Sequence, residues 1–360
     1  MFSPSDYTFG IPDIELHIHK NLKVQETLEM QLRLKRKWEY QKDILNKNTL
    51  LEHEQIEKWQ LERISLLVDF VFSNHPFYNQ LYKSIGYRRG DIVSLNDYNS
   101  LPIISKKDII DNYDLFKNAN LSPPISECYT SRTSGSSGQT LTIINDLTMT
   151  DNHMLVFYRF YDQILGRQRK ENEWLYDIYL AAPAFSSLDG KYPCFTVSNN
   201  CPIESVLEHL RIIKPAILNG FPSYLERLGA IIKDYRELGI KAIITNSESS
   251  TEAQRKKISL QFGAEVFDEY SSVENSLIAT QCNKKRYHII EDNVRVDVLN
   301  PDEEGFGEII VTNLHNTYMP FIRYKQGDIV KIASKNGCIC GNKFRHLETF
   351  MGRRDQFLYS

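Results

Sequence analysis

The sequence lacks long apolar runs and an excess of charge of one sign. Nowhere do 18 consecutive apolar residues occur, and the N-terminal stretch MFSPSDYTFG has neither the basic nor the apolar part of a secretory signal. We therefore expect no membrane insertion and no export. The 43 basic and 46 acidic residues give a net charge of -3, so nucleic acid and anionic membranes are not expected partners. A cytoplasmic protein with small-molecule ligands is predicted.

Cysteine is also scarce, with six residues among 360. In a reducing cytoplasm these are poor evidence for disulfides, and clustered cysteines are better considered as metal ligands. Cys128, Cys194 and Cys201 are interpreted as packing residues. We find no convincing Ser-His-Asp or Cys-His set, so the sequence does not favour a side-chain nucleophile.

Residues 1–80 are predicted to be helical, because they are rich in Leu, Glu, Lys and Gln. Apolar residues recur there at the spacing of one buried helix face: Ile64, Leu67, Val68 and Val71. The helices should end near Asn74-His75-Pro76, since proline disfavours helix before it. Loops and short helices are predicted to follow.

From about residue 215 the pattern changes to short β-branched runs that alternate with amphipathic helices, which predicts an α/β layer with mostly parallel strands. Ser250 or Thr251 is predicted to begin a helix that ends at Gly263. The later runs 294–298 and 307–312 are predicted to be half-exposed strands of a mixed outer sheet.

A loop rich in glycine and hydroxyl groups precedes the predicted strand at 141–144, with the sequence Thr130-Ser-Arg-Thr-Ser-Gly-Ser-Ser-Gly-Gln-Thr140. Glycine lets backbone N–H groups converge on a phosphate, and Ser and Thr add donors. It is not a Walker loop, since Gln139 stands where that loop has lysine. The alternative is a flexible serine-rich surface turn.

This loop resembles the phosphate-binding signature of adenylate-forming enzymes, and further motifs follow in that family's order. The resemblance is closest to the phenylacetate–CoA ligase family and its capsule-biosynthesis homologues, and it covers nearly the whole chain. The matching segments are Asn74–Tyr78, Leu101–Asp108, Leu218–Leu225, Asn246-Ser247-Glu248, Asp268–Glu274, Arg323–Asp328 and Gly352-Arg353-Arg354-Asp355. The resemblance implies an α/β fold with mixed parallel sheets flanked by helices.

The resemblance also implies roles for individual residues. Glu274 is expected to bind the Mg²⁺ that accompanies ATP, because a carboxylate is a hard oxygen ligand. Tyr270 offers a flat face to adenine, while Asp328 and Arg353 would bind the ribose hydroxyls. Beside Glu274, the expected catalytic residues are Thr133, Ser134, Ser136 and Ser137. The remaining residues expected to bind ATP or AMP are Gly135, Gly138, Ser247, Glu248, Glu269 and Ser271.

The implied reaction activates a carboxylic acid with ATP to give acyl-AMP, and then passes the acyl group to CoA. An aryl or acyl pocket is expected around Phe185, Asn219, Phe221 and Ser223, although these residues would equally suit ordinary core packing. The acceptor stays open, since some relatives are suggested to pass an acyl or aminoacyl group to a carrier protein or an amino sugar.

Three departures from the family pattern favour a different class of function. Gln139 replaces the loop lysine, Ser271 replaces glycine, and Val273 replaces a hydroxyl residue that contacts phosphate in relatives. Loss of that hydrogen bond would cost about 1–3 kcal/mol. A slow enzyme, or a degenerate non-catalytic homologue that acts as a scaffold, is the alternative.

A second constellation predicts a structural metal site. Cys282, His288, Cys338 and Cys340 would supply three thiolates and an imidazole, the closed tetrahedral set of structural Zn²⁺. Members of the resembled family have similar residues at these positions. The alternative is four unrelated residues.

The resemblance further divides the chain into a helical region at 1–80, the rest of the large domain at 81–355, and a hinge remnant at 356–360. The phosphate loop occupies 133–140 and the zinc site lies within 282–340 of the outer sheet. Asp355 matches the hinge, beyond which relatives have a small C-terminal domain. We expect that domain to be missing here, either by truncation at the hinge or because the large domain stands alone.

Overall fold

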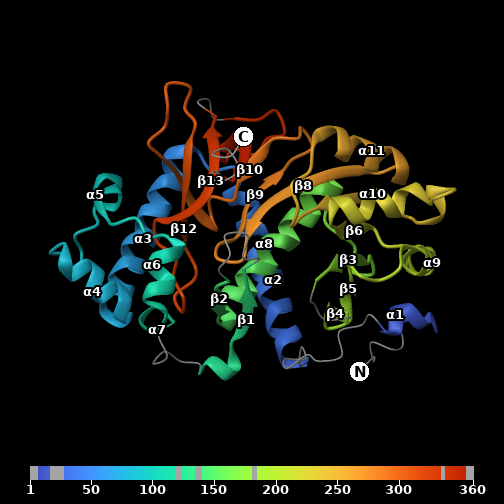
Figure 1. The fold of residues 1–360 in the computed structure, drawn as a ribbon, viewed down its shortest axis with the longest axis horizontal. Helices are drawn as coiled ribbons and strands as arrows, with labels where there is room; N and C mark the ends of the chain where they lie inside the picture. Colours follow the sequence, from blue (N-terminus) through green and yellow to red (C-terminus); the bar gives the residue numbers. More distant parts are fainter. Residues whose placement is uncertain are drawn as a thin grey trace. The chain divides into compact units, whose positions relative to one another are not determined.

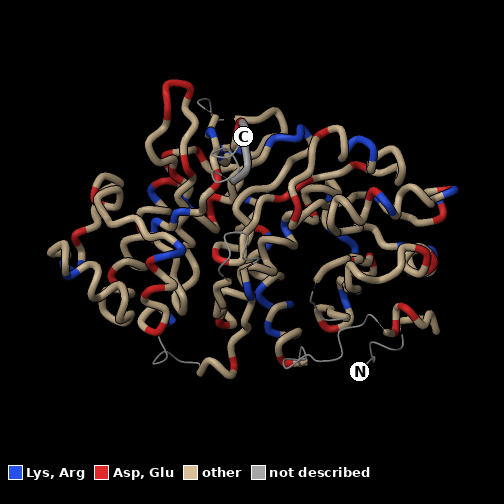
Figure 2. Tube along the Cα trace, viewed as in Figure 1, with Lys and Arg blue, Asp and Glu red and all other residues tan. Residues whose placement is uncertain are grey.

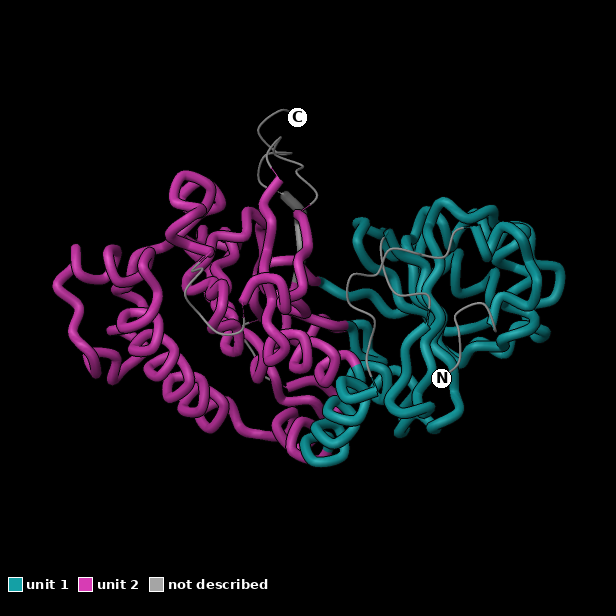
Figure 3. The backbone as a smooth tube through the Cα atoms, turned by 90° about the horizontal axis from the view of Figure 1, so that it is seen from below, with its two compact units in different colours: residues 1–42, 158–270, 281–285 teal, residues 43–157, 271–280, 286–360 magenta. Residues whose placement is uncertain are grey.

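The computed structural model describes residues 7–16, 28–117, 124–133, 140–180, 185–333 and 337–353, with side chains as far as residue 348. The chain divides into two compact units, each assembled from segments distant in sequence (Figure 3). Unit 1 comprises residues 1–42, 158–270 and 281–285. Unit 2 comprises residues 43–157, 271–280 and 286–360. The domain boundaries expected from the sequence stay a prediction.

The strands of unit 1 are mostly parallel. β4 (Phe185–Leu188), β5 (Lys191–Ser198), β3 (Leu175–Tyr179), β6 (Ile217–Gly220), β7 (Ala242–Thr245) and β8 (Glu265–Ser272) are neighbours in this order. Among the described pairings of these strands, only β4 with β5 is antiparallel. The expected alternation of short buried strands and helices after residue 215 is therefore confirmed.

The helices of unit 1 supply an apolar face that one side of these strands packs against. They are α1 (Pro12–Leu16), α9 (Ile203–Ile213), α10 (Pro222–Ala230) and α11 (Glu252–Phe262), with the short η3 (Tyr235–Glu237) (Figure 1). The core they form includes Tyr176, Ile178, Leu218, Ile243 and Val266 from the strands. Successive strand side chains point to opposite faces, so the residues between these lie on the other face of the strands.

The ends of α11 agree with the sequence prediction. The Thr251 side chain accepts a hydrogen bond from the Gln254 amide, at 3.1 Å, which satisfies one of the free N–H groups of the first turn. Gly263 ends the helix in the left-handed conformation, with φ of 61°. A Cβ there would meet the Tyr235 ring at 2.2 Å, so glycine is required for two reasons.

Unit 2 contains the antiparallel strands. Their order is β11 (Val294–Leu299), β12 (Gly307–Asn313), β13 (Tyr324–Ile332), β14 (His346–Arg353), β10 (Tyr287–Ile289) and β9 (Ser276–Gln281). A separate hairpin pairs β1 (Tyr129–Arg132) with β2 (Thr142–Asn145). The mixed parallel and antiparallel α/β class is confirmed.

The expectation of half-exposed strands at 294–298 and 307–312 is wrong for the second run. Every residue of β12 is buried, and β11 is buried over its first half. β12 lies between β11 and β13, and side chains from earlier in the chain make polar contacts with β11 and β12. Gln60 donates to the carbonyls of Glu291 and Val294, at 2.6 and 3.2 Å, and the hydroxyls of Tyr98 and Thr312 lie 2.8 Å apart.

The helices of unit 2 agree with the helix end and the short helices that the sequence predicts. α3 (His53–Asn74) ends at the expected position, and Pro76 then opens α4 (Pro76–Ser84), since proline is favoured in a first turn. Short helices follow as predicted: α5 (Leu95–Ser100), α6 (Lys106–Asp111), α7 (Tyr113–Phe116) and η2 (Ile125–Glu127). α2 (Leu28–Asn48) and α8 (Leu147–Leu165) have residues in both units.

The charge distribution agrees with the near-neutral composition. Lys and Arg are interspersed with Asp and Glu along the trace of both units (Figure 2). Among the described helices, none combines the length and the apolar character needed to cross a bilayer.

Candidate functional site

The two ends of the predicted phosphate loop are held together in unit 2. The Thr133 amide donates to the Leu141 carbonyl at 3.0 Å, and the Leu141 amide donates back to the Thr133 hydroxyl at 2.9 Å. The six residues from Ser134 to Gln139 lie outside the described residues. They include the predicted Ser134, Gly135, Ser136, Ser137 and Gly138. Thr133 itself is buried at the base of the loop.

A cation that the sequence analysis did not assign lies beside this base. The Lys106 ammonium donates to the Thr133 hydroxyl at 3.2 Å. Lys106 opens α6, whose N-cap Ser105 and Asp108 form a reciprocal capping box that fixes this helix end. The Ser-Lys-Lys-Asp sequence was noted as part of the family resemblance, but nothing local in it identifies which lysine faces the loop.

Glu274 occupies a turn that is fixed to β13. Its carboxylate is buried and accepts a hydrogen bond from the Tyr324 hydroxyl at 3.1 Å. The next residue, Asn275, donates to the Gln326 side chain at 2.9 Å. A buried carboxylate needs such partners, and its donor chemistry suits a hard cation. The predicted Mg²⁺ ligand is thus a carboxylate whose position is fixed by Tyr324.

Asp328 and Arg353, the two predicted ribose contacts, are register partners on the antiparallel strands β13 and β14. Gly327, with φ of 90°, precedes Asp328 within an irregular stretch where three residues of β13 oppose one of β12, Ile309. Such a bulge re-aims the residues beside it. Asp328 is buried, while the Arg353 side chain and the whole of Asp355 lie outside the description.

Val273, the departure from the family pattern, packs against the apolar core of unit 2. Its neighbour Ser271 is exposed. The valine therefore leaves the turn in place and packs against the core.

In unit 1, polar side chains connect three adjacent parallel strands, from the middle of β3 to the residue after β7. Asn219 on β6 donates to the Asp177 carboxylate on β3 at 2.9 Å, and Asn246, just after β7, donates to the Asn219 carbonyl oxygen at 2.7 Å. Burial raises the pKa of Asp177 to about 7, and the hydrogen bond from Asn219 only partly offsets this. We call these three residues the strand-end ladder.

Only Asn219 of the ladder was predicted as a pocket residue. Asn246 belongs to a motif that was matched to the family without a role, and Asp177 was missed. The signal was present, since Asp177 is a charged residue in the middle of a short strand, and Asn219 and Asn246 are polar residues near the ends of apolar strands. In open α/β sheets ligands bind at this edge.

The other residues predicted in unit 1 gather at neighbouring strand ends. The amide and hydroxyl of Ser223, in the first turn of α10, donate to the Glu248 carboxylate at 3.1 and 3.0 Å. Ser247 is exposed, with φ of 63°. Phe221 is buried and its ring stacks on Tyr179, with centroids 6.0 Å apart.

The remaining predicted site residues of unit 1 are Tyr270, Glu269 and Phe185, and their surroundings differ. Tyr270, late in β8, is nearly buried, and Glu269 is half-buried. Phe185 stacks on Tyr7, with ring centroids 4.7 Å apart, and lies 5.9 Å from Trp174. Phe185 thus has an aromatic packing role, and its part in a substrate pocket stays a prediction.

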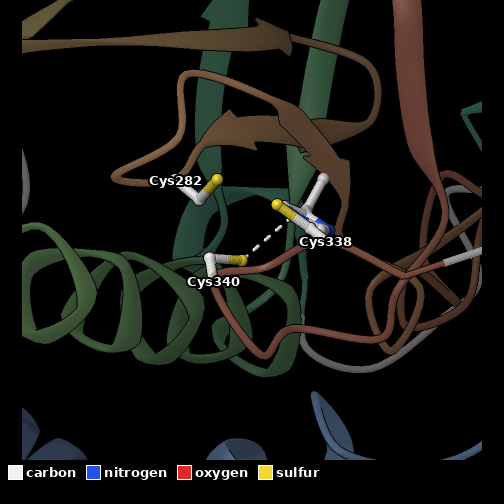
Figure 4. A group of neighbouring side chains, drawn as sticks. Cys282, Cys338 and Cys340 are labelled. Carbon is white, nitrogen blue, oxygen red and sulfur yellow. Dashed lines mark hydrogen bonds between the residues drawn. The ribbon is translucent and has the colours of Figure 1, made fainter.

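The four predicted zinc ligands form a cluster. The candidate ligand atoms of Cys282, His288, Cys338 and Cys340 all lie within 4.8 Å of one another (Figure 4). Tetrahedral zinc with bond lengths of about 2.0–2.3 Å needs ligand atoms roughly 3.3–3.8 Å apart, which this grouping fits.

The histidine of this cluster is oriented for ligation. Its Nδ1 lies 2.9 Å from the Phe344 carbonyl oxygen, and its Nε2 lies 3.4 Å from the Cys340 sulfur. A proton on Nδ1 would leave Nε2 as the ligating atom. Burial is the largest cause that lowers the pKa of His288, which favours the neutral ring that a metal requires.

Comparison with known proteins agrees with the sequence resemblance. No family model matches the chain. Phenylacetate–coenzyme A ligase of Aromatoleum evansii is 24% identical over 325 residues, which is 85% of this chain and 72% of that protein. The chain is thus similar to phenylacetate–CoA ligases over most of its length. Protein CapK of Staphylococcus aureus is also 24% identical, over 86% of this chain and 71% of CapK.

Solved structures give the same fold. A 2-hydroxyisobutyryl-CoA ligase, crystallised in an open conformation with 2-HIB-AMP and CoA, matches this chain with a TM-score of 0.69 and 18% identity. The match covers 84% of this chain and 76% of that one. A postadenylation state of the same ligase matches with a TM-score of 0.68. The fold is that of the adenylate-forming ligases.

Proposed function

We propose that this protein uses ATP to activate a carboxylic acid as an acyl-adenylate, and that CoA is the acceptor of the acyl group. The acid's carboxylate oxygen attacks the α-phosphorus of ATP and pyrophosphate leaves. The thiol then attacks the acyl carbon and AMP leaves. No protein nucleophile is needed, so catalysis rests on positioning and on stabilising charge on the phosphate oxygens.

One observation carries this proposal. Separate motifs of unit 2 converge on one strand, since Tyr324 of β13 holds the Glu274 carboxylate at 3.1 Å and Asp328 of β13 pairs with Arg353. Each would be an ordinary polar residue alone. Together they supply an acidic metal ligand and two groups suited to ribose hydroxyls, in the order that the homologous ligases lead one to expect.

The ATP phosphates are proposed to lie against the loop 134–139, whose ends Thr133 and Leu141 bring together. Lys106 beside Thr133 would supply the positive charge that Gln139 cannot. Magnesium, held by Glu274, would neutralise phosphate charge when bound. Adenine would lie against Tyr270.

Zinc is proposed to have a structural role. Three thiolates and one imidazole fill a tetrahedral shell and leave no position for a substrate. Backbone amides of Lys284 and Asn342 point at the sulfurs of Cys282 and Cys340, at 3.3 and 3.4 Å, which would stabilise thiolates. The ion would fix the turns that carry these residues.

A second acceptor is supported by the similarity to CapK. On that alternative the same acyl-adenylate would be passed to a carrier protein or an amino sugar. The scaffold alternative rests on the lost phosphate contact at Val273, and the packing of Val273 against the core of unit 2 does not replace that contact.

Calorimetric titration with Mg-ATP, AMP and a stable acyl-sulfamoyl adenosine tests the proposal. Micromolar affinity for the acyl analogue is expected, with at least tenfold loss in Asp328→Asn. Asp114→Asn is the matched control, because that side chain is 95% exposed at the surface of unit 2. The proposal would be contradicted if none of the three adenosine compounds bound the wild type. It would also be contradicted if Asp328→Asn bound the acyl analogue as tightly as Asp114→Asn does.

A further inference from the structure

The strand-end ladder of unit 1 has a direction that is set by its carboxylate. An ionised Asp177 can only accept hydrogen bonds, so Asn219 must turn its amide nitrogen toward it. The Asn219 oxygen then accepts from the Asn246 nitrogen. The last group in the chain of hydrogen bonds is therefore the Asn246 oxygen.

That last oxygen is a buried acceptor without a partner. Asn246 is 4% exposed, and its side-chain oxygen has no hydrogen-bond donor within the described parts of the chain. A buried acceptor left unpaired costs about 1–3 kcal/mol. Such a cost at a strand end is expected where a ligand supplies the missing donor.

The inner end of the ladder lacks a counter-charge. Within the described residues no Lys or Arg forms an ion pair with Asp177. Asp177 keeps part of its surface accessible, unlike Tyr176 and Ile178 beside it, which point into the helix-covered core. Asp177 therefore lies on the opposite strand face, near Tyr161 of α8.

Charged groups of both signs lie near Asp177. Burial raises the pKa of Tyr161 well above its ordinary value; the nearby Cys194, Asp177 and Glu269 raise it further, and the nearby Arg169 lowers it. Arg169 donates elsewhere, to the Tyr192 carbonyl oxygen at 3.3 Å. A carboxylate without a paired cation therefore still favours a positively charged ligand group. A hydroxyl would satisfy the acceptors but would leave this charge uncompensated.

We propose that Asp177 and Asn246 bind a protonated amine on the body of the acid, so that the substrate class is an amino-substituted carboxylic acid. This inference rests on the proposed function, because it places the acyl group at the carboxyl ends of β3, β6 and β7. Tyr179 and Phe221, which stack beside the ladder, would contact the apolar part of the acid.

A matched series of acyl-sulfamoyl adenosines tests the inference by calorimetry with the full chain. The series has one carbon skeleton: butanoyl, 3-hydroxybutanoyl, and 2-, 3- and 4-aminobutanoyl. At least one amino member is expected to bind about 10–100-fold more tightly than butanoyl, as a charge-assisted hydrogen bond permits. Asp177→Asn and Asn246→Ser should each reduce this preference at least tenfold.

Asp189→Asn is the matched control. Asp189 is exposed in the turn after β4 with φ of 54°, a conformation that asparagine also tolerates, so this variant should keep the preference. Thermal unfolding of each variant checks the fold.

The outcomes separate the two proposals. Three results would overturn the inference alone. The butanoyl compound could bind as tightly as every amino member, or the hydroxyl member could bind as tightly as the best amino member. The preference for an amino member could also survive in Asp177→Asn. Failure of every member and of AMP to bind the wild type would overturn the proposed function, and the inference with it.

Discussion

Replacing Asp177 by Asn should stabilise the protein, and by more at high pH than at low pH. Burial raises the pKa of this carboxyl from 3.8 to about 7. A raised carboxyl pKa means that the folded state holds the proton more tightly than the unfolded state. Asp177 therefore destabilises the folded state least below pH 3.8, where its carboxyl is protonated in both states. The loss of folding free energy grows as the pH rises and is complete once the pH passes about 7.

The magnitude follows from this pKa difference. It spans about three pH units at about 1.36 kcal/mol each, so the full penalty is about 4 kcal/mol, of which about 3 kcal/mol develops between pH 5 and pH 8.5. Asparagine keeps an oxygen to accept from Asn219 and carries no charge. The free energy of unfolding of Asp177→Asn relative to wild type should thus rise by about 3 kcal/mol over this range.

Denaturant unfolding at pH 5, 7 and 8.5 measures this difference, because every other titrating group cancels between wild type and variant. Asp189→Asn, an exposed control that removes a surface ion pair with Lys35, should not reproduce this rise. If the Asp177→Asn difference is flat over this range, Asp177 is not held in a desolvated position and the account of the ladder fails.

Three further predictions concern the other sites. Glu274→Gln should lower the rate of ATP–pyrophosphate exchange about 10²-fold, because the charged oxygen ligand is lost; unchanged exchange at limiting Mg²⁺ would remove Glu274 from the metal site. Lys106→Ala should weaken ATP binding about tenfold and leave AMP binding nearly unchanged, whereas Lys107→Ala, exposed and paired with Asp111, should change neither. Cys340→Ser should reduce bound zinc, which we expect at about one per chain by elemental analysis, and lower the melting temperature; a metal-free wild type with the same melting temperature would contradict the structural role.

Features set by local chemistry were predictable from the sequence. The helix ends at Asn74 and Gly263 follow from a proline and a left-handed glycine beside them. The four zinc candidates were predicted from residue type, and the structure groups them within 4.8 Å.

Features set by strand pairing were not predictable in the same way. Asp177 meets Asn219 because β3 and β6 pair in a particular register across 42 residues of sequence. No local pattern specifies that register. The burial of β12 likewise depends on partners far away in the sequence, such as Tyr98, whose hydroxyl lies 2.8 Å from that of Thr312. Lys106 was missed for the same reason, since its neighbour Thr133 is 27 residues away.

A crystal structure of the chain with a bound acyl-sulfamoyl adenosine tests the central claim most directly. The account predicts one adenylate whose sulfamate, which replaces the α-phosphate, lies near Glu274 and whose ribose hydroxyls contact Asp328 and Arg353. An adenylate bound away from these residues, or these residues lining different clefts, would contradict it.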